Sequence, residues 1–141
     1  MEREKPRARV LIVEDEDTIA LALDYLMTRE GYAHDRVADG AEALTRIRET
    51  RPDLVLLDVM LPGVSGYDIC RCVRTDPRLS GVKILMMTAR GSAMERRKGM
   101  ELGADGIIAK PFELTKLRDE VRRLLGQAGV RRTDRTGSRP R

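Results

Sequence analysis

The chain has 141 residues, about one domain's worth, of which 41% are hydrophobic and 35% charged, a balance typical of a globular protein with a heavily charged surface. No apolar run approaches the roughly 18 residues that a membrane span needs, and the N-terminus lacks the apolar core of a secretion signal. We therefore expect a cytoplasmic protein without a membrane partner, and its two cysteines are too few for a disulfide scaffold.

The net charge of +4 belongs to one end of the chain. Residues 127–141 hold five arginines and one acid, whereas residues 1–126 carry 22 basic and 22 acidic groups. The basic balance therefore gives no indication of a nucleic-acid-binding surface on the folded part. We predict an N-terminal extension at 1–8, one domain at 9–126, and a basic disordered tail or linker at 127–141.

Short apolar runs predict the strands. The runs at 10–13, 54–57, 84–87 and 107–109 show no polar alternation, as expected of strands buried on both faces of a parallel sheet. The more polar segment 32–37 predicts a weak strand at the sheet edge.

Segments between these runs have helical spacing. Apolar residues recur at helical intervals from Ile19 to Met27, with Asp17 as a plausible N-cap, and from Ala41 to Ile47. The last stripe runs from Leu114 and is expected to end at Gly126. Helices at 65–73 and 92–102 are less clear. Strand and helix alternate five times, which predicts an α/β fold with a doubly wound parallel sheet.

Polar residues follow the apolar runs where the carboxyl ends of parallel strands meet. Glu14, Asp15, Asp58, Thr88 and Lys110 are expected to converge there, because open parallel sheets bind ligands at that edge. Clustered carboxylates repel one another, and hard oxygen ligands without nearby His or Cys suit Mg²⁺. With an ammonium, a hydroxyl and an Asp able to act as nucleophile, the set indicates a site for an aspartyl phosphate.

Four motifs carry a resemblance to a known family. They are VLIVEDED at 10–17, PDLVLLDVMLPGVSG at 52–66, ILMMTAR at 84–90 and GADGIIAKPF at 103–112. In this order and spacing, the set resembles the receiver domain of bacterial two-component response regulators. The resemblance implies a flavodoxin-like (βα)5 fold with strand order 2-1-3-4-5.

The resemblance also implies how the acidic residues act. Asp58 would accept a phosphoryl group from the phosphohistidine of a sensor histidine kinase or phosphotransfer protein. Asp15, Asp58 and the backbone carbonyl of Met60 would bind Mg²⁺ directly, and Glu14 would act through water. The domain would phosphorylate and slowly dephosphorylate itself, without being an enzyme that turns over a metabolite.

Other positions take roles from the same resemblance. Lys110 would pair with the phosphoryl oxygens, Thr88 would hydrogen-bond one of them, and Pro111 would follow a cis peptide bond. Met60 and Arg90, flanking the phosphoryl entry path, would set the lifetime of the phosphorylated state.

The sequence departs from the family pattern at the switch position. The family pairs the threonine with an aromatic residue whose counterpart here is Ile107, which has neither a ring nor a hydroxyl. Phosphorylation should survive this change, whereas Ile107 cannot supply the ring edge or hydroxyl that the usual readout with Thr88 employs.

Assembly is the second departure. The winged-helix subfamily dimerises through its fourth helix, fifth strand and fifth helix. Arg96 and Glu101 match that charge pattern, whereas Gly106 and Glu120 break it. A homodimer through that face is therefore possible but not favoured.

The output of the signal is left open by the sequence. The chain is either a free-standing receiver acting on a protein target, slightly favoured by the two departures, or the N-terminal half of a DNA-binding transcription factor. A magnesium-dependent phosphatase with an aspartyl nucleophile is disfavoured, because Met60 stands where that class has a second Asp. Nucleotide binding is disfavoured because no glycine-rich loop follows the first strand.

Overall fold

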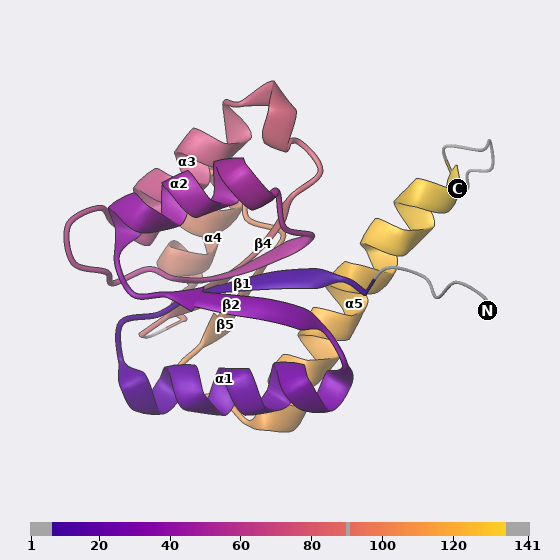
Figure 1. Cartoon of the computed structure of the whole chain (residues 1–141). Helices are drawn as coiled ribbons and strands as arrows, with labels where there is room; N and C mark the ends of the chain where they lie inside the picture. The colour runs from indigo at the N-terminus through magenta and orange to yellow at the C-terminus, as the bar shows by residue number, and fades with distance from the viewer. Residues whose placement is uncertain (1–6, 90, 135–141) are drawn as a thin grey trace.

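The protein forms one parallel sheet covered by helices on both faces (Figure 1). The structure is a computed structural model that describes residues 7–89 and 91–134, with side chains described up to 126. The sheet order is β2-β1-β3-β4-β5, so the predicted fold and strand order are confirmed. The strands are β1 (Arg9–Val13), β2 (Ala33–Val37), β3 (Leu54–Asp58), β4 (Lys83–Thr88) and β5 (Gly106–Ala109).

The sheet separates the core into two layers, each covered by helices. The helices are α1 (Asp17–Glu30), α2 (Gly40–Thr50), α3 (Gly66–Arg74), the 3-10 turn η1 (Pro77–Leu79), α4 (Ala93–Glu101) and α5 (Leu114–Asp134). One cluster of buried side chains joins α1 and α5 to the sheet, and a second joins α2 and α3 to its other face. Because both faces are covered, every residue of β3 is buried.

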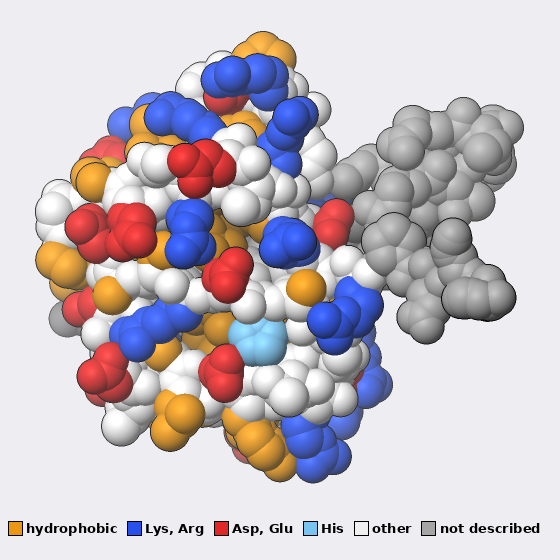
Figure 2. All heavy atoms as spheres, viewed as in Figure 1, with side chains coloured by type: hydrophobic (Ala, Val, Ile, Leu, Met, Phe, Trp, Pro, Cys, Tyr) orange, Lys and Arg blue, Asp and Glu red, His pale blue; other side chains and the backbone are white. Residues whose placement is uncertain are grey.

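The edge strand β2 differs from the central strands. Its residues Asp35 and Arg36 are exposed, and only Val37 is buried. Figure 2 shows acidic and basic side chains interspersed over the face that carries β2. Charged side chains are a common way to keep an edge strand from pairing with another chain.

Side-chain caps start α3 and α4 but not α1. Ser65 and Ser92 each accept a hydrogen bond from a backbone amide three residues later. The expected cap at Asp17 is wrong, because α1 already begins at that residue and Glu16 takes the cap position without a side-chain bond. The carboxylate of Asp17 instead pairs with Arg36, at 3.0 Å.

The last helix is longer than expected. α5 continues through Gly126 to Asp134, so the predicted end at Gly126 is wrong and residues 127–134 of the expected disordered tail are helical. Gly126 does not adopt the left-handed conformation that Gly31 (φ 83°) uses to end α1. A helical glycine costs only about 1 kcal/mol, and extending an existing helix is far easier than starting one. The rest of the tail, 135–141, and residues 1–6 of the predicted extension lie outside the described residues.

Candidate functional site

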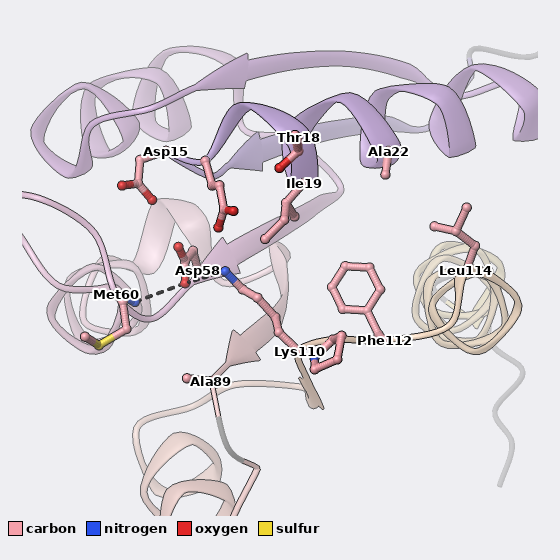
Figure 3. A pocket seen from close by; sticks show the side chains of 12 residues that line it. Asp15, Thr18, Ile19, Ala22, Asp58, Met60, Ala89, Lys110, Phe112 and Leu114 are labelled. Atoms are coloured by element: carbon pink, nitrogen blue, oxygen red, sulfur yellow. Dashed lines mark hydrogen bonds and ion pairs between the residues drawn. The ribbon is translucent and has the colours of Figure 1, made fainter.

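The predicted site residues meet at the carboxyl edge of the sheet, and Figure 3 shows three of them there, Asp15, Asp58 and Lys110. Glu14 follows β1, Asp58 and Thr88 end β3 and β4, and Lys110 follows β5. Asp15 begins the loop into α1. Parallel register brings these strand ends side by side, although 96 positions separate Glu14 from Lys110.

Three carboxylates form an acidic cluster. One oxygen from each of Glu14, Asp15 and Asp58 lies within 4.8 Å of the other two. Glu14 and Asp58 are buried, at 0% and 2% exposure, whereas Asp15 is exposed. Such a set of hard oxygen atoms, open to solvent on one side, can hold a divalent cation.

Lys110 links the two buried carboxylates. Its Nζ lies 3.1 Å from Glu14 Oε1 and 3.3 Å from Asp58 Oδ1. Burial alone would lower the pKa of Lys110, but the hydrogen bond to Glu14 and the charge of Asp58 outweigh it, so the pKa is raised. The ammonium therefore stays charged. The bond between Lys110 and Pro111 is cis, as the resemblance implies.

The buried carboxylates are harder to ionise than ordinary ones. Burial raises the pKa of both Glu14 and Asp58, although backbone amides that donate to them act in the opposite direction. Those amides belong to Glu16 (3.0 Å to Glu14 Oε2) and Met60 (3.1 Å to Asp58 Oδ1). With one ammonium for two buried carboxylates, the site is one positive charge short of neutrality.

Thr88 contributes an unpaired hydroxyl. Its side chain is buried at 1% exposure, and Oγ1 has no hydrogen-bond partner within the described part of the chain. Its backbone carbonyl accepts from the amide of Lys110 at 2.7 Å, which ties the end of β4 to the lysine. A buried donor without a partner costs free energy, which a ligand oxygen at this position would recover.

The acidic cluster opens into a larger hollow. A cavity of about 820 Å³ extends from Asp58 and Lys110 along α1, where Ile19, Ala22 and Phe112 form an apolar wall (Figure 3). Sequence reasoning missed this wall because the helical stripe assigns Ile19 and Ala22 to the core. Both are only half-buried, which is the signal that a helical-wheel pattern does not supply.

The remaining predicted positions lie around the site or next to it. Met60 is 70% exposed at the mouth of the cavity. Ile107 is half-buried against the core, and its carbonyl accepts from Arg96 Nη1 at 3.4 Å. Arg90 lies outside the described residues.

Charged groups of the possible dimer face are engaged within the chain. Glu120 pairs with Arg123 on the same helix, at 2.7 Å. Arg96 also donates to the carbonyl of Gly91, at 3.2 Å. The structure contains one chain and shows no dimer.

Comparisons with known proteins agree with the fold. The family model of the response regulator receiver domain matches residues 10–122. The DNA-binding response regulator MtrA of Mycobacterium tuberculosis H37Rv is 44% identical over 128 residues, covering 91% of this chain and 53% of MtrA. The phosphate regulon regulator PhoB of Rhizobium meliloti is 41% identical over 120 residues, covering 85% and 53%. The chain thus spans about half the length of the curated relatives it matches.

Solved structures show the same arrangement. The chemotaxis response regulator CheY4 of Vibrio cholerae has a TM-score of 0.79 and 30% identity, covering 84% of this chain and 98% of CheY4. The receiver domain of the sensor histidine kinase PA1611 from Pseudomonas aeruginosa PAO1, solved with a magnesium ion in its active-site cleft, has a TM-score of 0.78 and 28% identity, covering 86% and 99%.

Fold, site and matches together define a signalling receiver of two-component systems rather than a metabolic enzyme. The chain belongs to the response regulator receiver domain family. No helix in the described residues is both long and apolar enough to cross a membrane.

Proposed function

We propose that Asp58 is the phosphoacceptor, taking its phosphoryl group from the phosphohistidine of a sensor histidine kinase or phosphotransfer protein. The observation that carries this proposal is the position of Lys110 Nζ, within 3.3 Å of both buried carboxylates at the edge where Asp15 completes the cluster. A carboxylate held beside an ammonium in a solvent-accessible cavity is a suitable nucleophile for phosphoryl transfer.

The same residues fit a magnesium ion. Asp15, Asp58 and the backbone carbonyl of Met60 would hold it directly, with Glu14 acting through water. The excess of carboxylates over ammonium groups and the all-oxygen donor set support this assignment, as does the ion found in the PA1611 receiver. When bound, Mg²⁺ would neutralise the charge that accumulates on the phosphoryl oxygens.

The transfer step makes one bond and breaks one. An oxygen of the Asp58 carboxylate bonds to phosphorus while the phosphorus–nitrogen bond of the donor breaks, and the donor imidazole leaves with that electron pair. Lys110 would form an ion pair with the phosphoryl oxygens once they are bound to Asp58, since its Nζ already lies 3.3 Å from Asp58 Oδ1. Thr88 can donate its hydroxyl, which has no partner among the described residues, to one of them.

The phosphorylated state then ends by hydrolysis. Water attacks phosphorus, the bond from phosphorus to Asp58 breaks, and the carboxylate and inorganic phosphate are released. Met60, at the mouth of the cavity, and Arg90 are proposed to set the rate of this step by controlling access of water. The chain would therefore turn over only its own phosphoryl group.

The proposed output concerns two residues that carry the signal out of the site and the activity that the signal controls. Thr88 and Ile107 are the proposed switch pair, on neighbouring strands β4 and β5. Because MtrA is a DNA-binding response regulator, we propose that the signal of this receiver controls DNA binding. A receiver acting on a protein target is the alternative, and Ile107 in place of the family's aromatic residue favours it.

Phosphorylation is tested with acetyl phosphate and Mg²⁺, followed by intact mass. Wild type should gain the mass of one phosphoryl group and Asp58→Asn none, while Asp68→Asn, which removes an exposed acid from α3, should label normally. Equal labelling of Asp58→Asn would move the acceptor to another residue. Turnover of p-nitrophenyl phosphate by the wild type would favour the phosphatase instead.

The metal assignment has its own matched pair. Asp15→Ala should weaken Mg²⁺ binding far more than Glu16→Ala, although both residues are exposed acids in the same loop. Similar losses for the two variants would show that only the overall charge of the loop matters, and would remove Asp15 from the metal site.

A further inference from the structure

Arg36 lies across the loop that carries the acidic residues. It is exposed on the edge strand β2, in register with Ile12 of β1. Its Nε donates to the backbone carbonyl of Glu14 at 3.0 Å, and its Nη1 lies 3.0 Å from Asp17 Oδ1. One guanidinium therefore holds the loop on both sides of Asp15.

The contact of Arg36 with the Glu14 carbonyl continues the pairing of β1 and β2 beyond their last backbone hydrogen bond. The amide of Glu14 donates to the carbonyl of Val37 at 3.1 Å, and β2 ends at that residue. The carbonyl of Glu14 comes next along β1 and accepts from the side chain of Arg36 instead of a backbone amide. Both backbone groups of Glu14 are thus held by consecutive residues of β2, which fixes the peptide that leads into Asp15.

Charge makes this support necessary. Residues 14–17 are four consecutive acids, and like charges so close in sequence tend to spread apart. Within the described part of the chain, two cations form ion pairs with them. Lys110 pairs with Glu14 and Arg36 with Asp17. Arg36 is the one that pairs with Asp17, which is not a member of the acidic cluster.

We infer that Arg36 is a positioning residue for the metal site, holding the loop so that the Asp15 carboxylate stays beside Glu14 and Asp58. The inference rests on the proposed function, in which that cluster binds Mg²⁺. The two contacts that would do this are those of Arg36 with the Glu14 carbonyl and with the Asp17 carboxylate. Neither contact involves a carboxylate oxygen of the acidic cluster. Groups that hold metal ligands in place commonly change metal affinity 10–100-fold when removed.

Charge and geometry make opposite predictions at this position. If Arg36 acted only through its positive charge, removing it would strengthen the binding of a cation nearby. If it acts by holding the loop, removing it must weaken binding. The sign of the change in Mg²⁺ affinity therefore separates the two.

The experiment is an Mg²⁺ titration of the metal-free chain, followed by amide NMR spectra without a phosphodonor. Wild type, Arg36→Ala and Arg36→Lys are compared with Arg46→Ala. Arg46 is a matched control, because its side chain is also 33% exposed and pairs with an acid of β2, Asp35, at 3.9 Å. We expect the dissociation constant to rise roughly tenfold in Arg36→Ala, the lower end of that range, and to stay unchanged in Arg46→Ala.

Arg36→Lys keeps the charge but not the planar fork that contacts carbonyl and carboxylate together, so it should bind Mg²⁺ more weakly than wild type. A second readout needs no metal. In EDTA, the amides of Asp15 and Glu16 should exchange faster in Arg36→Ala, while those of β3 should keep their protection and show that the variant is folded.

The outcomes separate the two proposals. If wild type shows no saturable Mg²⁺ binding, the proposed metal site fails and the role of Arg36 fails with it. If wild type binds but Arg36→Ala or Arg36→Lys binds equally well or more tightly, the inference about Arg36 fails while the metal site stands.

Discussion

Replacing the proposed phosphoacceptor should stabilise the metal-free protein. Asp58→Asn preserves shape and leaves Oδ1 able to accept from the amide of Met60. It removes one of the two buried carboxylates that share Lys110, leaving a single pair between Lys110 and Glu14. Metal-free protein at neutral pH should therefore unfold at a higher temperature after the substitution.

The magnitude follows from the separations of the charges. At an effective dielectric constant of 20, attraction between Lys110 and Asp58 at 3.3 Å is about 5 kcal/mol. Repulsion between Glu14 and Asp58, at no more than 4.8 Å, is at least about 3.5 kcal/mol. Desolvation of the Asp58 carboxylate costs several kcal/mol more, so ionisation is unfavourable overall, in agreement with its raised pKa. We expect a net gain of about 1–2 kcal/mol, or roughly 4–6 °C in Tm.

The sign depends on pH in a defined way. Since the pKa of Asp58 is raised in the folded state, the native protein binds more protons than the unfolded chain, and wild type loses stability as pH rises through the folded-state pKa. The advantage of Asp58→Asn should be largest at neutral and higher pH. It should shrink as pH falls toward the ordinary pKa of aspartate, about 4, and vanish below it, where the wild-type carboxyl is protonated in both states.

The assay is thermal unfolding in EDTA from pH 4 to pH 8, repeated with Mg²⁺. Asp15→Asn is the control, because it removes an exposed acid from the same cluster and should give a smaller gain. Mg²⁺ should stabilise wild type more than Asp58→Asn and so reduce the difference. An Asp58→Asn variant no more stable than wild type at pH 8 in EDTA would refute the electrostatic reasoning.

Three further results are expected. Thr88→Val should leave the free energy of unfolding unchanged or raise it by about 1 kcal/mol, since it removes a buried hydroxyl that has no partner among the described residues. It should also slow labelling by acetyl phosphate. A clear loss of stability in urea unfolding would show that the hydroxyl is bonded. Gly66→Ala should destabilise by about 2 kcal/mol or more, because a Cβ would lie 2.4 Å from the backbone oxygen of Asp58, and an unchanged unfolding midpoint would contradict that contact. Iodoacetamide at pH 8 should modify Cys72 before Cys70, whose burial raises its pKa to about 11; mass mapping that finds Cys70 modified first would contradict its burial.

The fold and the main site residues were predictable because their signals are local. A buried parallel strand is a short apolar run, and the polar residue that follows it must lie at the carboxyl edge of the sheet. This reasoning placed Glu14, Asp58 and Lys110 together without knowledge of their contacts. In the structure, an oxygen of each carboxylate lies within 3.3 Å of Lys110 Nζ.

Helix ends were less predictable. Asp17 and Gly126 have the residue types of a cap and a terminator, but neither acts as one here. Asp17 is drawn into an ion pair with Arg36, on another element. Residue type sets a preference of about 1 kcal/mol at such positions, which a single tertiary contact or a continuing helix can outweigh.

Residues that hold the backbone of the site residues in place were not predictable, and the reason is geometric. Gly66 matters because α3 begins against the backbone of Asp58, leaving no space for a Cβ. Arg36 reaches Glu14 only because β1 and β2 pair with Ile12 opposite Arg36, a register that no motif in either segment specifies. Side chains that perform chemistry carry their residue type as a signal, whereas those that hold them in place are recognised by contacts that form after the strands have paired. Arg36 therefore has to be tested by the geometry that it preserves, and not by its charge alone.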